Sequence, residues 1–261
     1  MHVLGAVGPG ATDLHDRLAR RLDGRVATVE SVPTGDTARD DDPADAAFGL
    51  SEDGAWVGAG DGTSLPDLLD GLAPEFDYAL LAGFPEARVP TVTLGGSEAR
   101  GELLAAPDAA SVDVDDVADA LAATEPWITL ESLVEGIKEV PEADRAGAIA
   151  TFTGRVRARD GPEDARTTHL EFEMYEGVAQ ERMDAIEREL AERDGVLAVR
   201  SHHRTGVIED GEDIVFVVVL AGHREEAFRT VEDGINRLKD EVPIFKKETT
   251  VEDKFWVHER T

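Results

Sequence analysis

Residues 213–247 read DIVFVVVLAGHREEAFRTVEDGINRLKDEVPIFKK, and this stretch decides the fold of the C-terminal half. Asp213–Leu220 is apolar enough to predict a buried strand. Glu225–Val242 carries apolar residues at spacings of three, four and three, which predicts a helix with one buried face. These residues are Phe228, Val231, Ile235 and Leu238. Pro243 ends the helix, and Ile244–Val251 is the next predicted strand.

The rest of the C-terminal half also alternates strands with helices. Strands are predicted at Ala148–Val156, Leu170–Tyr175, Val196–Val207 and Phe255–Val257, and a helix at Val178–Arg193. Glu209–Glu212 is a credible turn that would join the strands on either side of it as a hairpin. Because consecutive strands are joined as hairpins, we predict an α+β domain.

The N-terminal half has a different pattern. His2–Val7 is a short apolar strand that runs into a glycine loop and then a helix. Two more buried strands, Tyr78–Gly83 and Val89–Leu94, precede a helix at Val112–Ala123, so we predict a small parallel α/β layer. Residues 33–65, rich in Asp, Gly, Ala and Pro, are predicted to be loop. A linker at residues 124–126 would separate a domain of residues 1–123 from one of residues 127–261.

Charge limits the classes of partner. Acids outnumber bases 56 to 26, which gives a formal net charge of -30. Because this charge repels phosphates and anionic lipid, we expect no nucleic acid and no membrane as partners. The charges alternate with apolar residues, which predicts a solvated acidic surface of the kind found in halophilic proteins, where salt screens self-repulsion.

The chain has no cysteine, which excludes disulfides, thiolate metal sites and a cysteine nucleophile. Its longest strongly apolar run, Ile214–Gly222, has nine residues. A bilayer span needs roughly 20 residues. No signal peptide is evident either, so we expect a cytoplasmic protein.

The lysines are unevenly distributed. Only five of the 26 basic residues are lysine, and four of those five lie between Lys239 and Lys254. Unlike a guanidinium, an ammonium group can give up a proton when it is crowded, and so act as a base or a nucleophile. A simpler alternative is that Lys239 only complements the dipole at the end of a helix.

Other cations lie at predicted strand ends. His223 and Arg224 come where a strand gives way to a helix, a junction that suits an anion. Alternation along a strand would place Arg155 and Arg157 on one face, opposite Val156. If these segments converge, they would bind a small phosphorylated substrate.

Metal and cofactor sites are not expected. His202 and His203 are adjacent, so on a strand they point to opposite faces, and the spacing of the histidines fits no metal site. We predict no metal and no cofactor.

Five ordered motifs carry a resemblance that covers residues 127–261. The motifs are ATFTGRVR (150–157), LEFE (170–173), HRTG (203–206), GHR (222–224) with Ala227-Phe228, and LK through VPIFKKE (238–248) with Trp256-Val257. In order and spacing they resemble the catalytic (large) subunit of molybdopterin synthase, the MoaE family. The resemblance implies an α/β hammerhead fold and a homodimer. It also implies a heterotetramer with a ubiquitin-like (MoaD-like) sulfur carrier whose Gly-Gly C-terminus bears a thiocarboxylate.

The resemblance further implies a substrate, cyclic pyranopterin monophosphate (precursor Z), and a set of site residues. Lys239 and Lys246 match the catalytic lysines, and Arg260 matches an arginine that reaches the neighbouring subunit's site. Phe245 and Lys247 stand where the family often has Trp and Arg. The substrate-binding residues implied are Phe152, Arg155, Val156, Arg157, His223, Arg224, Lys247, Glu248 and Arg260.

Residues 1–123 resemble the MobB family of molybdenum-cofactor GTP-binding proteins, through the loop GAVGPGAT (5–12) and the strand LLAGF (80–84). The phosphate loop of that family needs a lysine where this chain has Ala11, so we predict a degenerate P-loop without GTP hydrolysis. Two alternatives to the synthase stay open. The chain could be a GTP-binding adaptor for cofactor insertion, or an acceptor to which ubiquitin-like carriers are conjugated through Lys239 or Lys246.

Overall fold

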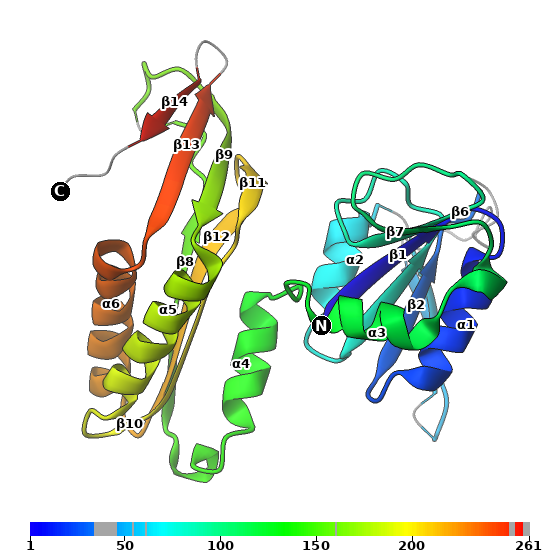
Figure 1. Cartoon of the computed structure of the whole chain (residues 1–261). Helices are drawn as coiled ribbons and strands as arrows, with labels where there is room; N and C mark the ends of the chain where they lie inside the picture. The colour runs from blue at the N-terminus through cyan, green and yellow to red at the C-terminus, as the bar shows by residue number, and fades with distance from the viewer. Residues whose placement is uncertain (34–45, 54, 61, 160, 251–253, 258–261) are drawn as a thin grey trace. The chain divides into compact units, whose positions relative to one another are not determined.

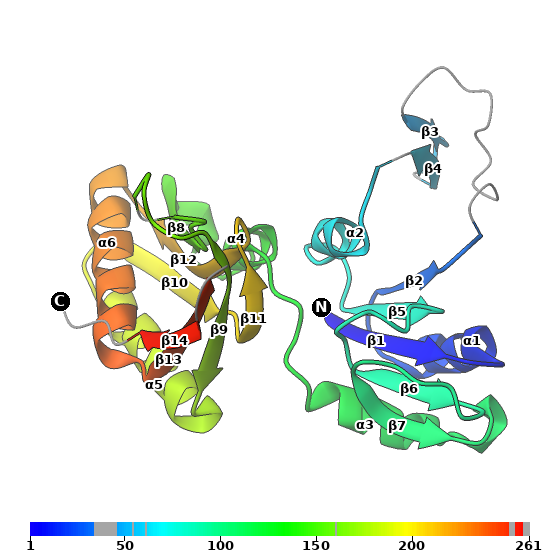
Figure 2. The same ribbon diagram turned by 90° about the horizontal axis from the view of Figure 1, so that it is seen from above.

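The computed structural model describes residues 1–33, 46–53, 55–60, 62–159, 161–250 and 254–257. The chain divides into two compact units, Met1–Thr129 and Leu130–Thr261 (Figures 1 and 2). Each unit has its own hydrophobic core, and each is described by itself below.

A five-stranded sheet in the order β2-β5-β1-β6-β7 forms the centre of the first unit, and all its strands are parallel. The strands are β1 (His2–Val7), β2 (Val26–Glu30), β5 (Tyr78–Ala82), β6 (Thr91–Leu94) and β7 (Glu102–Ala106). The helices are α1 (Ala11–Arg21), α2 (Leu65–Leu72) and α3 (Val114–Ala122), with a short 3-10 turn, η1 (Ala109–Ser111). Helices α1 and α3 cover one face of the sheet through Leu14 and Leu121, and α2 covers the other through Leu69. The prediction of a parallel layer is therefore confirmed.

The prediction that residues 33–65 form a loop is wrong for part of this range. A two-stranded antiparallel sheet forms from β3 (Ala46–Leu50) and β4 (Trp56–Gly60). Helix α2 begins at the last residue of the predicted loop, where Ser64 caps it with a capping box to Asp67. Residues 34–45, also part of the predicted loop, lie outside the residues that the structure describes.

Two antiparallel sheets make up the second unit, in the orders β10-β12-β8 and β11-β9-β13-β14. The strands are β8 (Ala148–Arg155), β9 (Thr167–Met174), β10 (Val196–His203), β11 (Gly206–Glu209), β12 (Asp213–Ala221), β13 (Ile244–Thr250) and β14 (Lys254–Val257). The helices are α4 (Leu130–Lys138), α5 (Glu176–Ala191) and α6 (Arg224–Glu241), with a short 3-10 turn, η2 (Ala143–Arg145). Antiparallel sheets with separate helices confirm the α+β prediction.

The helices of the second unit cover both faces of its three-stranded sheet. Val217 and Val219 of β12 pack with α5 and α6, while Val218 and Leu220 pack with Ile137 of α4. The sequence did not predict α4. The predicted hairpin is also wrong in detail, because the chain passes from β10 through β11 before it reaches β12. Strand β10 does pair with β12, whereas β11 pairs with β9 in the other sheet.

Candidate functional site

Helix α6 places the predicted cations at its two ends. His223 is the N-cap residue, in an extended conformation with φ -139° and ψ 160°, and Arg224 is the first helical residue. Lys239 lies in the last turn, and the helix ends at Glu241 because Pro243 follows the C-cap Val242. Lys239 is 15 positions after Arg224, which corresponds to about 22 Å at 1.5 Å per residue. The expected convergence of these cations is therefore wrong within one chain.

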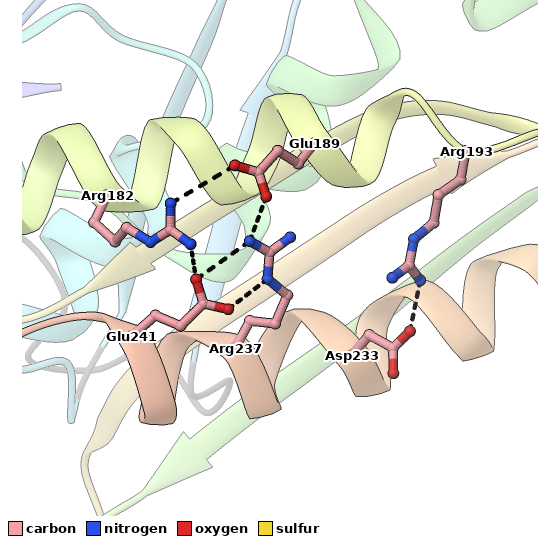
Figure 3. Close-up of polar contacts among 6 residues, drawn as sticks. All are labelled: Arg182, Glu189, Arg193, Asp233, Arg237 and Glu241. Carbon is pink, nitrogen blue, oxygen red and sulfur yellow. Dashed lines mark hydrogen bonds and ion pairs between the residues drawn. The ribbon is translucent and has the colours of Figure 1, made fainter.

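Ion pairs hold one side of α6 against α5 (Figure 3). The guanidinium of Arg237 lies 2.7 Å from Glu241 and also pairs with Glu189 of α5, and Arg182 of α5 pairs with Glu241. A further pair, Arg193 to Asp233, joins the segment just after α5 to the middle of α6 at 2.6 Å. The N-terminal end of α5 thus lies beside the C-terminal end of α6.

This network shows which way Lys239 points. At about 100° per residue, Arg237 and Lys239 point about 160° apart on the helix. Lys239 therefore lies on the flank of α6 that faces away from α5. Arg224 and Phe228 fall on this flank too, within about 60° of Lys239. All three are exposed.

Phe228 is exposed, although the sequence pattern predicted that it would be buried. The spacing placed it on the buried face of the helix with Val231, Ile235 and Leu238, and those three residues are buried. Phe228 itself is 64% exposed. Phe228 is thus an exposed aromatic ring that lies between the cations Arg224 and Lys239 on this flank of the helix.

Strand β13 separates its two lysines. Lys246 pairs in register with Phe172 of β9, and Lys247 pairs with Glu171. Because side chains alternate along a strand, Lys246 points to the face of Phe172 and Lys247 to the opposite face. There the ammonium of Lys247 lies 3.3 Å from the Glu171 carboxylate.

The face of β13 that carries Lys246 is largely apolar and packed. Phe172 is 5% exposed and belongs to a core with Val156, Leu170 and Ile208. Glu248 lies two residues after Lys246 on this face, and its carboxylate accepts a hydrogen bond from the hydroxyl of Thr167.

Phe152 connects this face to the end of α6. Its half-buried ring packs against the core cluster that contains Leu238 and Val242, and Ile244 packs against the same cluster. Lys239 follows Leu238 in the sequence, and Lys246 lies two residues after Ile244. Phe152 and Ile244 therefore pack against the same apolar cluster as Leu238, the neighbour of Lys239.

The arginines after β8 are arranged differently from the prediction. The strand ends at Arg155, so the alternation that would place Arg157 on the same face does not continue. Arg155 pairs with Asp213 at 3.0 Å and donates to the carbonyl of Gly211, while Val156 is buried. Arg157 is exposed in the segment that follows the strand. Arg260 lies outside the described residues.

His203 is buried and its neighbour His202 is half-buried. Burial lowers the pKa of both His202 and His203 to about 4. His203 Nδ1 lies 2.8 Å from the carbonyl of Arg204, and the ring meets Phe172 edge-on at 4.9 Å. These contacts are those of a packed structural residue. Within the described ranges, no group of three or more His, Asp or Glu side chains could hold a metal ion, and no helix could cross a membrane.

Sequence reasoning missed two features of this end of the unit. The α5–α6 network was not predicted, although the spacing of Arg237 and Glu241 by four positions is a recognised helix pairing. Tyr175 was taken only as a strand residue, but it is the N-cap residue of α5, is 67% exposed and stacks edge-on against Phe245.

Comparisons with known proteins point to one family. The sequence model described as MoaE protein matches residues 124–241. A protein of Haloferax volcanii named probable molybdopterin synthase is 62% identical over 261 residues, which is the full length of both chains. The molybdopterin synthase catalytic subunit of Bacillus subtilis is 37% identical over 123 residues, 47% of this chain and 77% of that protein. A crystal structure of molybdopterin synthase from Staphylococcus aureus matches 44% of this chain and 83% of its own, with 32% identity and a TM-score of 0.42.

Proposed function

Because this chain belongs to the MoaE family of molybdopterin synthase catalytic subunits, transferases of molybdenum cofactor biosynthesis, we propose that Lys239 and Lys246 are its catalytic lysines. The substrate is cyclic pyranopterin monophosphate, and the sulfur donor is a ubiquitin-like carrier with a C-terminal thiocarboxylate. The observation that carries the proposal is the position of the two lysines. Lys239 lies in the last turn of α6, Lys246 is the third residue of β13, and only Val242 and Pro243 separate the two elements.

In this reaction the protein mainly positions the reactants and supplies positive charge. The thiocarboxylate sulfur forms a C–S bond to a carbon of the substrate side chain while the C–O bond at that carbon breaks, and the departing oxygen leaves as water or stays on the phosphate when its ring opens. Water then cleaves the resulting thioester. That hydrolysis leaves the sulfur on the substrate and a carboxylate on the carrier. A second carrier repeats the step to complete the dithiolene. The lysines position the anionic tail and transfer protons, and the cations neutralise the phosphate as its ring opens.

A comparison of two lysines tests this assignment. Lys138 lies in the last turn of α4, as Lys239 lies in the last turn of α6, so it is a matched control for the loss of a lysine at a helix end. We expect Lys239→Ala to lower the rate of molybdopterin formation by roughly 10²-fold or more, because it removes an acid–base group. Lys138→Ala should keep the wild-type rate. If Lys239→Ala stays within about twofold of wild type, the assignment is wrong.

A homodimer would bring the separated cations together. His223 and Arg224 lie about 22 Å from Lys239 along one helix, yet Arg224, Phe228 and Lys239 share its free flank. If the flanks of two copies pack antiparallel about a two-fold axis, Arg224 of each copy comes opposite Lys239 of the other. Phe228 would then be buried near the axis. A substrate phosphate between the two cations would offset their mutual repulsion.

The other family positions complete this proposed site. Arg157 and Arg260 would contact the phosphate and pterin, with Arg260 reaching the site of the neighbouring subunit. Phe152 would wall the pocket. Lys247 and Glu248 would act less directly, because Lys247 is paired with Glu171 on the other face of β13 and Glu248 is bonded to Thr167.

We assign the N-terminal unit no GTPase activity. Its loop after β1 ends at Gly10, which has a left-handed φ of 85° and caps α1 without a side-chain hydrogen bond. The next residue, Ala11, has only a methyl group where a P-loop provides a lysine ammonium. A degenerate MobB-like unit that aids stability or assembly fits this loop better than the GTP-binding adaptor does.

A further inference from the structure

Thr167 begins strand β9 at a point where the pairing with β13 is irregular. Thr249 of β13 pairs in register with His169. The next residue, Thr250, pairs with Thr167, so Thr168 is an extra residue in β9. Such a β-bulge bends the strand that contains it and re-aims its side chains, and bulges are common next to active sites.

The bulge turns Thr167 toward the face of the sheet that carries Lys246. Phe172 points to this face, and unbroken alternation would place Thr168 there and Thr167 on the opposite face. Instead, Thr167 is 5% exposed, and its hydroxyl donates a hydrogen bond to the carboxylate of Glu248. Thr167 therefore meets β13 on the side where its proposed catalytic lysine lies.

The backbone of Thr167 also holds the segment that carries Arg157. Its N–H donates to the carbonyl of Ala158 at 2.8 Å, and Ala158 directly follows Arg157. Before Arg157, Val156 exchanges two backbone hydrogen bonds of 2.9 Å with the turn at residues 211–212. Thr167 thus joins two cation-bearing segments of the proposed site, one through its backbone and the other through its side chain.

Glu248 is an anion close to both of these segments. It lies two residues after Lys246 on one face of β13, so their Cα atoms are about 7 Å apart. Its carboxylate is bonded to Thr167, whose neighbour across the backbone hydrogen bond is Ala158. A carboxylate that belongs to the protein has a high effective concentration near these cations, so once released it would compete with a substrate phosphate for them.

We propose that Thr167 is a positioning residue for substrate binding. Its hydroxyl holds the Glu248 carboxylate, and this anion is thereby kept from competing with the substrate phosphate for Arg157 and Lys246. This inference rests on the proposed function. A hydrogen bond to a charged group is among the stronger ones, so one hydroxyl is sufficient to bias where the carboxylate lies.

Two neighbouring threonines provide a matched comparison. The hydroxyl of Thr168 also donates to β13, but its acceptor is the backbone carbonyl of Thr249, at 3.0 Å. Thr167→Val and Thr168→Val therefore remove the same group from adjacent positions, and only the first releases a carboxylate. In the full-length chain, calorimetry gives the Kd for cyclic pyranopterin monophosphate. Steady-state assays at saturating carrier give the KM for this substrate and kcat.

We expect Thr167→Val to raise the Kd and KM for the substrate at least fivefold, with kcat at saturating substrate within twofold of wild type. Thr167→Ala should do the same, whereas Thr167→Ser and Thr168→Val should match wild type. In a Glu248→Gln background, Thr167→Val should leave the Kd of that background unchanged, because the released group is then neutral.

A substrate Kd within twofold of wild type in Thr167→Val would overturn this role and leave the proposed function intact. A rise of equal size with and without Glu248→Gln would also overturn it, because a purely structural defect does not depend on that charge. If Lys239→Ala keeps wild-type activity, the catalytic assignment fails, and the calorimetric Kd still decides the role of Thr167.

Discussion

Mixing two inactive variants tests whether each active site is shared between two chains. In Arg224→Ala and Lys239→Ala homodimers every site lacks one cation, so each variant alone should be weak. If Arg224 serves the site of the partner chain, a mixed dimer has one site with both defects and one site with neither. Equal amounts that exchange subunits at random give about half mixed dimers, each with one of its two sites intact, so activity should recover to about a quarter of wild type.

The structure excludes a site in which Arg224 and Lys239 of the same chain act together. The two residues are about 22 Å apart along α6, so one chain cannot present both to the same phosphate. Molybdopterin formation is measured before and after mixing, and native mass spectrometry confirms the exchange. Adding Phe228→Asp to both variants should abolish the recovery, because it places a charge in the proposed interface. Absence of recovery despite confirmed exchange would refute the shared site.

Four further predictions concern stability and the role of the N-terminal unit. Burial lowers the pKa of His202 and His203 to about 4, below the value of about 6.5 in an unfolded chain, so acid favours unfolding. Urea titrations should show a loss of about 2 kcal/mol per histidine between pH 7.5 and 5, partly opposed by Glu187, whose pKa burial raises. Arg237→Ala should lower the free energy of unfolding by about 1 kcal/mol in the same titration, because its ion pairs are partly exposed. A chain beginning at Pro126 should keep synthase activity in the molybdopterin assay, and the intact chain should bind GTP no tighter than about millimolar by calorimetry, because its loop lacks the P-loop lysine.

Local sequence pattern predicted most of the second unit. The apolar run of β12, the amphipathic repeat of α6 and the stop at Pro243 each follow from neighbours within a few positions. Helix α4 was not predicted, although its nine residues, LESLVEGIK, carry an amphipathic pattern that could have indicated it. Strand β11 was predicted as part of the strand before it, because its four residues are too few to be recognised as a separate strand. Strands β3 and β4 were hidden by a composition of alanine and glycine that is usual in loops.

The candidate site could be predicted only as a set of residues. Motif order identified Lys239, Lys246 and Arg224, and the predicted helix already implied, at about 1.5 Å per residue, that Arg224 and Lys239 lie far apart in one chain. Phe228 shows a limit of local pattern, because an apolar repeat predicts which residues share a face but not where the buried part of that face stops. The buried face of α6 includes Val231 but not Phe228, and the ion pairs of Arg237 and Glu241 with α5 lie on the flank opposite Phe228.

The separation of the cations also has an electrostatic consequence. A chain with a net charge of -30 repels an anionic substrate at long range, so attraction must come from cations within about 8–10 Å at moderate salt. In a lone subunit, each end of α6 offers only part of that cationic set. In the proposed dimer, Arg224 of one subunit and Lys239 of the other meet at each active site. The repulsion between these cations is relieved when the substrate phosphate binds. Substrate binding should therefore stabilise the dimer, and dimerisation should raise substrate affinity by the same factor, because the two equilibria are linked.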